Sequence, residues 1–296
     1  MKFTHLSESY SLEDDMRLIR ILTSSVLGIL AMSAPVAGAP GPGAPLPLTQ
    51  QPSPKENPST AIPQPTQPPA AHASDGLITV TAPTVEDAEE ILGAAQKGLE
   101  AILKGLGLDA KDGNLPPLPP LNINVVYTNA QGGWAGFTKE GAIVIGKTDL
   151  STALESLNHE LTHYVVKVHF AKLPIWCNES MACMNSSPSL QKTFTRTTAW
   201  YPRTKKWPPL SSVINVSKMT ASDAQEYALA YSLGRFLTEG QSKSKDTLVK
   251  FALAAKNDGL APALQQFYGI KDQKELQTLW QDWVSKTTAD PADDLH

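Results

Sequence analysis

The chain has 296 residues, of which 41% are hydrophobic, and its 25 basic and 29 acidic side chains give a net charge near −4. This length is sufficient for one domain with a substantial core and additional segments. The slightly acidic balance gives no electrostatic basis for binding nucleic acid or an anionic membrane surface, so we expect no nucleic-acid partner.

Residues 1–39 have the layout of a secretory signal peptide. A basic start at 16–20 is followed by an apolar run over 21–32 and by small residues over 34–39. The acidic side chains within 1–15 are unusual for an export signal and favour Met16 as the start. The alternative is an uncleaved membrane anchor, because the apolar run approaches spanning length. We therefore expect a secreted or periplasmic protein, with membrane attachment only in the second case.

Residues 40–76 are rich in Pro, Gln, Ser and Ala and show no apolar periodicity. Such a segment cannot bury enough apolar surface to offset the entropy of ordering it. The composition predicts a disordered linker, with a Pro-rich docking segment as the alternative.

Residues 77–287 are expected to form the folded domain, and 288–296 a tail. The patterns predict strands over 77–82, 121–127 and 141–146, a helix over 84–106 capped by Thr84, and a second helix that begins near Ser151. Further helices are expected over 221–239, 245–257, 261–268 and 272–286, and a long loop over 188–209. The predicted fold class is α+β: a small mixed sheet with the second helix, followed by a mostly helical lobe.

Residues 159–163 read His159-Glu160-Leu161-Thr162-His163, and Glu179 follows sixteen residues later. Histidines four apart on a helix lie on one face and can bind a single ion. Glu160 is placed to act as a general base, and Glu179 would complete a two-histidine, one-carboxylate zinc site with an open position. The alternative is a pair of half-buried core histidines beside a solvated glutamate.

Two segments, Leu157-Asn158-His159-Glu160-Leu161-Thr162-His163-Tyr164 and Leu173-Pro174-Ile175-Trp176-Cys177-Asn178-Glu179-Ser180-Met181-Ala182, resemble the gluzincin metallopeptidases. The closest similarity is to the peptidase MA-like group, distant relatives of thermolysin and of the zinc aminopeptidases. Residues 226–237, 267–270 and 276–283 are similar to later helices of that family. The resemblance covers roughly residues 77 to 287.

The resemblance implies a zincin-like fold and the hydrolysis of peptide bonds in a peptide or protein substrate. One zinc ion, held by His159, His163 and Glu179, would activate a water for which Glu160 is the general base. Tyr227 matches the family's tyrosine that stabilises the oxyanion, and Tyr231, one turn further on, is its rival. The family's edge strand binds extended substrates, and Gly141, Ala142, Ile143 and Val144 are the matching residues here.

The chain also departs from the family pattern. Ser180 stands where the family usually has glycine, and Cys177 and Cys183 flank the third ligand. A disulfide between these cysteines would need Cys177 to precede the helix, because residues six apart on one helix face different directions. The glycine-rich stretch 132–136 lacks the glutamate with which aminopeptidases hold a free amine, so an endopeptidase is favoured. The alternative function is a catalytically inactive zincin-like scaffold that binds a peptide or an envelope partner.

Overall fold

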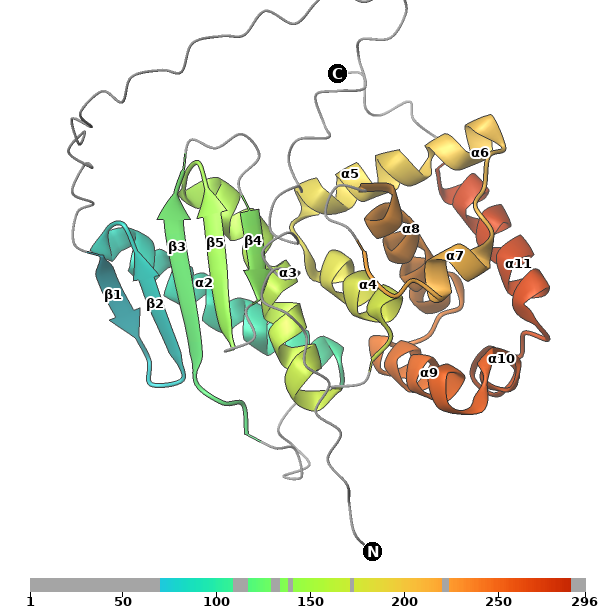
Figure 1. Ribbon diagram of the computed structural model, residues 1–296, viewed down its shortest axis with the longest axis horizontal. Helices are drawn as coiled ribbons and strands as arrows, with labels where there is room; N and C mark the ends of the chain where they lie inside the picture. The colour runs from blue at the N-terminus through green and yellow to red at the C-terminus, as the bar shows by residue number, and fades with distance from the viewer. Residues whose placement is uncertain are drawn as a thin grey trace, which may run out of the picture.

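The computed structural model describes residues 70–108, 117–128, 134–137, 141–170, 173–219 and 224–288. The signal or anchor expected over residues 1–39, most of the expected linker and nearly all of the tail lie outside these ranges. Within them the chain has the predicted α+β class: a five-stranded mixed sheet followed by a mostly helical region (Figure 1).

The sheet contains β1 (Ala71–Ser74), β2 (Ile78–Ala82), β3 (Leu121–Tyr127), β4 (Trp134–Phe137) and β5 (Ala142–Lys147) in the spatial order β1-β2-β3-β5-β4. Strands β2, β3 and β5 are parallel, and the two outer strands run antiparallel to their neighbours. Alternate residues of the three central strands are buried, which agrees with one face packed against helices.

Two predictions about the sheet were wrong. Strand β1 lies within the range 40–76 expected to be a linker, so the folded domain has begun by Ala71. The segment Gly141–Val144, expected at the substrate-binding edge, instead lies between two strands. Ile143 pairs with Ile123 on one side and with Phe137 on the other, so β4 is the edge. The periodicity of β5 could not distinguish an edge from an interior strand, because β4 is only four residues long and carries little pattern of its own.

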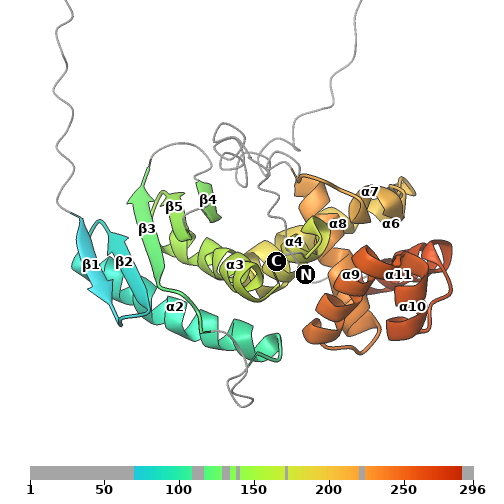
Figure 2. The same cartoon turned by 60° about the horizontal axis from the view of Figure 1, so that its bottom comes forward.

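Helices α2 (Val85–Gly105) and α3 (Leu150–His169) pack against each other and against the sheet, and Figure 2 shows α2 running along it. Thr84 caps α2 as predicted, with its hydroxyl accepting from the Asp87 amide. The cap of α3 is Asp149 and not Ser151; the Asp149 carboxylate accepts from the Thr152 amide at 2.9 Å. Asp and Ser both suit a cap position, but the helix begins at Leu150, so Ser151 already lies within its first turn.

The helical region contains α4 (Ile175–Asn185), α5 (Pro188–Thr198), α6 (Trp200–Thr204), α7 (Leu210–Ile214), α8 (Ala224–Arg235), a short π-helix (Phe236–Gly240), α9 (Lys245–Asp258), α10 (Leu260–Tyr268) and α11 (Gln273–Thr287). The loop predicted over 188–209 is therefore largely helical. Ser187 caps α5 and Pro188 occupies its first turn, a helix start that the weak periodicity of the segment concealed.

Trp280 packs with Tyr201 and Trp207 of the segment predicted as a loop, whereas Trp200 of the same segment is exposed. The ring of Trp207 lies 5.4 Å from those of Tyr201 and Trp280, and the Trp280 indole donates to Ser232. Helix α4 packs between α3 and α8, so it joins the sheet half to the helical half (Figure 1). In the described part of the chain, no helix is both long and apolar enough to cross a membrane.

Candidate metal centre

Two adjacent helices bring His159, His163 and Glu179 together. The histidines lie one turn apart on α3, with their ring centroids 4.8 Å apart. Helix α4 begins after Pro174, whose fixed backbone ends the connection from α3, and carries Glu179 in its second turn. The three residues form a group of potential metal ligands, as the sequence predicted.

The distances between the ligand atoms match those required around one ion. Nε2 of His159 and Nε2 of His163 are 3.1 Å apart, and Oε2 of Glu179 lies 3.6 and 3.4 Å from them. Ligands about 2.0–2.1 Å from a tetrahedral ion are separated by roughly 3.3 Å. The three side chains can therefore bind one metal ion without rearrangement.

Hydrogen bonds behind each imidazole fix which nitrogen is available. The Ser186 hydroxyl donates to the Ala182 carbonyl, so it accepts from Nδ1 of His159 at 3.2 Å. Nδ1 of His163 lies 3.0 Å from Oδ1 of Asn178 and donates to it. With both Nδ1 atoms protonated, both Nε2 lone pairs point at the same place, which is the arrangement that metal-binding histidines require.

The space between the ligands requires a positive charge. Two nitrogen lone pairs face each other there, and Oε2 of Glu179 is buried and makes no hydrogen bond with any described residue. Burial alone would raise the pKa of Glu179, but His163 and His159 outweigh it and the pKa is lowered. Burial likewise opposes protonation of His163, yet Glu179 raises its pKa to about 9. In the metal-free chain a proton therefore takes the place that a metal ion would occupy.

Glu160 follows the first ligand on α3 and is only 3% exposed. A second charged group, Lys147 at the end of β5, is 5% exposed. Burial lowers the pKa of Lys147, while Glu160 and Glu155 oppose that shift. The Glu160 carboxylate is thus buried from solvent and interacts electrostatically with the buried ammonium of Lys147. Sequence patterns gave no signal for Lys147, because it ends a strand that otherwise reads as apolar.

The structure separates the two candidate tyrosines. The ring of Tyr227 lies 6.5 Å from that of His159, and burial, followed by the charge of Glu179, raises its pKa. Its hydroxyl therefore stays protonated and can donate. The Tyr231 ring packs on Phe194 at 5.4 Å, and its hydroxyl donates to Gln191 at 3.4 Å. Of the two, Tyr227 has the ring contact with a potential metal ligand, whereas the contacts of Tyr231 are with Phe194 and Gln191.

The departures from the family pattern have physical explanations. Cys177 and Cys183 both lie within α4, and both are buried free thiols whose pKa is raised by burial. They neither form a disulfide nor present a thiolate to a metal. Ser180 is buried against α8 at Gly234, where an added Cβ would lie 1.7 Å from the serine Oγ.

Comparison with known proteins adds no assignment. No protein-family model matches the chain, and no curated protein is significantly similar to it. The interpretation of the site therefore depends on the positions and chemistry of its own residues.

Proposed function

We propose that this protein is a zinc-dependent hydrolase that cleaves peptide bonds, with His159, His163 and Glu179 as zinc ligands. The observation that supports the proposal most strongly is the convergence of two imidazole lone pairs and one carboxylate oxygen, each 3.1–3.6 Å from the others. Two nitrogens and one oxygen form a donor set that zinc accepts in hydrolytic sites, where a fourth position stays open.

When bound, zinc supplies Lewis acidity, which polarises a substrate carbonyl and favours deprotonation of water at neutral pH. Glu160 is the side chain that takes up the proton and returns it to the leaving amine, because it is adjacent to His159 and buried. Because Glu160 is buried from bulk water, its electrostatic interaction with a zinc ion bound nearby would be stronger than at the surface.

Tyr227 is proposed to donate a hydrogen bond to the oxyanion that develops on the substrate carbonyl. Its position near His159 and the raised pKa of its hydroxyl support this role. For the substrate backbone, β4 is now the candidate strand in place of Gly141–Val144. It is an edge strand of the sheet and contacts α3, the helix that carries both histidines, so an extended peptide could pair with it.

The test combines metal analysis with peptide cleavage. Purified protein is loaded with zinc and incubated with a mixed peptide library, and cleaved bonds are identified by mass spectrometry. The proposal predicts cleavage that is abolished by a chelator, restored by zinc, and lost in Glu160→Gln although that variant still binds zinc. Zinc binding without any cleavage would instead support the inactive scaffold.

A further inference from the structure

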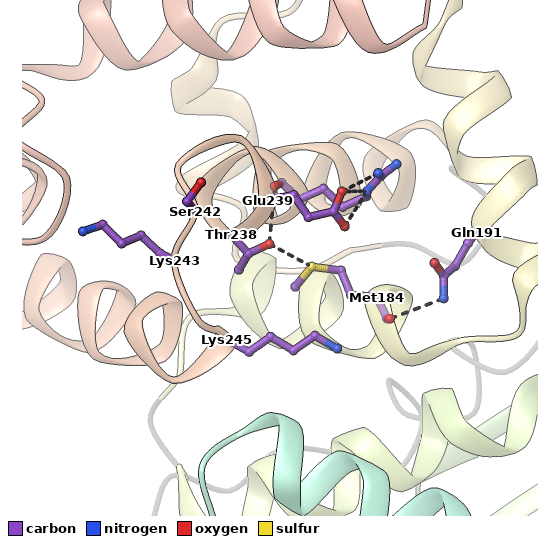
Figure 3. Close-up of a pocket in the computed structure, with 8 residues that line it drawn as sticks. Met184, Gln191, Thr238, Glu239, Ser242, Lys243 and Lys245 are labelled. Atoms are coloured by element: carbon purple, nitrogen blue, oxygen red, sulfur yellow. Dashed lines mark hydrogen bonds and ion pairs between the residues drawn. The ribbon is translucent and has the colours of Figure 1, made fainter.

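A cavity that is open to solvent lies outside the metal site, with a volume of about 400 Å³. Its lining comes from α4, α5, the end of α8, the π-helix with the turn after it, and the start of α9, and Figure 3 shows the side chains that line it. They include Met184, Thr238 and four charged residues, Arg235, Glu239, Lys243 and Lys245. Neither the metal ligands nor Glu160 is among the lining residues.

The cationic side chains around this cavity outnumber the anionic ones. Glu239 provides the one carboxylate of the lining, and it is paired with Arg235 through both the Nε and Nη2 atoms of the guanidinium group. Asp246, next to Lys245 in sequence, faces Lys250 instead, at 2.7 Å. The lining therefore has three cations for one carboxylate.

Lys245 is a partly buried cation of this lining: burial lowers its pKa, and the charge of Glu239 opposes that shift. Its side chain is partly buried and passes Gly105 of α2, with Cδ 3.9 Å from where a Cβ of that glycine would lie. Its ammonium donates to the neutral Oδ1 of Asn185. Figure 3 shows the ammonium beneath Met184, on the side facing Gln191, whereas Lys243 points away at the rim. The carboxylate that acts on Lys245 is that of Glu239, which is already paired with Arg235, so a bound anion would give this ammonium a direct charged partner.

Arg235 already pairs with one carboxylate of the lining, that of Glu239 four residues later in the chain. Glu239 is held on the guanidinium of Arg235, which is itself fixed between the rings of Tyr231 and Trp283, each 5.6 Å away. The guanidinium has five N–H donors, so pairing with Glu239 leaves others for a second acceptor. Ser242 adds a hydroxyl at the rim. Donors thus exceed acceptors around the cavity.

We propose that this cavity is a binding site for a small anionic ligand whose phosphate or carboxylate group is held by Lys245 and Arg235. The methionine and the threonine methyl group provide an apolar wall for the rest of such a ligand. The site is independent of the proposed hydrolysis, because its residues and those of the metal centre do not overlap.

The experiment uses the full chain after removal of metal with a chelator, so that anions cannot bind through zinc. Inorganic phosphate and succinate are titrated separately at constant ionic strength, with chloride as the balancing ion. A short pulse of an acetylating reagent then labels the lysines, and mass spectrometry reads each site. Both anions should slow acetylation of Lys245 about threefold or more at saturation, and Lys250, on the same helix, should be unaffected.

Two variants separate a site from general screening. Lys245→Gln should abolish the saturable rise in thermal stability that phosphate or succinate produces, whereas Lys250→Gln, which removes an exposed cation, should keep it. Protection by one anion alone identifies the ligand class as phosphate or as carboxylate. Equal changes at Lys245 and Lys250, or no saturation in the wild-type protein, would overturn the proposal. The acetylation readout needs no variant, so it stands even if Lys245→Gln fails to fold.

Discussion

Nε2 of His159 and Nε2 of His163 lie 3.1 Å apart, while the Nδ1 atoms of the two rings are directed at different neutral oxygens, those of Ser186 and Asn178. Two unprotonated nitrogens at this separation repel each other unless a cation lies between them. The packing of α3 against α4 therefore holds the two rings where a metal ion or a proton is needed between them.

The hydrogen bonds to Nδ1 should contribute to metal affinity. Asn178→Ala and Ser186→Ala each remove one acceptor and leave the metal ligands intact, so we expect zinc affinity to fall about 10–100-fold while the fold is retained. Competition with a chromophoric chelator measures the affinity, and circular dichroism checks the fold. Asn215→Ala, at the exposed residue that follows α7, is the matched control. An unchanged affinity in both variants would show that these bonds do not orient the rings.

Zinc binding should be pH-dependent in a direction set by His163. Its pKa is raised to about 9 in the metal-free chain, because Glu179 outweighs the effect of burial. Below that value zinc must displace a proton, so apparent affinity should rise by roughly tenfold per pH unit between about pH 7 and 9 and then level off. Calorimetry in buffers of different ionisation enthalpy counts the released proton. An affinity that is flat across this range would contradict the assignment of the proton to His163.

The close approach of α4 and α8 predicts a stability defect that can be rescued. Gly234→Ala places a methyl group 1.7 Å from the Ser180 Oγ and 3.0 Å from its Cβ, so either the Ser180 side chain or the helices must shift. We expect a net loss of about 1–2 kcal/mol, since overpacking exceeds the gain in helix propensity.

Chemical denaturation of the two single variants and of the double variant measures this coupling. Replacing Ser180 by Gly in the Gly234→Ala background should recover most of the loss, because it removes the atom that clashes. Additive effects of the two substitutions would show that the helices do not meet at these residues.

The two tyrosines on α8 should behave differently. Tyr227→Phe removes the hydroxyl proposed to bind the oxyanion, so we expect peptide cleavage to slow by about 10²–10³-fold in kcat with little change in zinc affinity. Tyr231→Phe removes a hydroxyl bonded to Gln191 and should leave kcat within a few-fold of the wild-type value. The reverse order of effects would make Tyr231 the oxyanion donor.

The metal site was predictable from sequence because it depends on local spacing. The offset between His159 and His163 places both on one helical face, and Glu179 follows on the next helix in chain order. The helices of the C-terminal half could also be predicted, since their apolar periodicity and glycine boundaries are local features.

What the sequence did not reveal depends on contacts between distant segments. Ser186 and Lys147 approach His159 and Glu160 only after α4 and β5 pack against α3, and no motif links them. The edge position of β4 similarly follows from strand order, because β5 pairs with the distant β3 on its other side. The helices over 188–204 were concealed because their polar, threonine-rich faces weaken periodicity.

X-ray absorption spectroscopy at the zinc edge, on protein loaded with one equivalent of zinc, is the most direct test of zinc binding by His159, His163 and Glu179. We expect one bound zinc per chain with nitrogen and oxygen ligands at about 2.0–2.2 Å, of which two are imidazoles. His163→Ala should lose one imidazole ligand. A failure to retain zinc, or sulfur ligands at about 2.3 Å from Cys177 or Cys183, would contradict it.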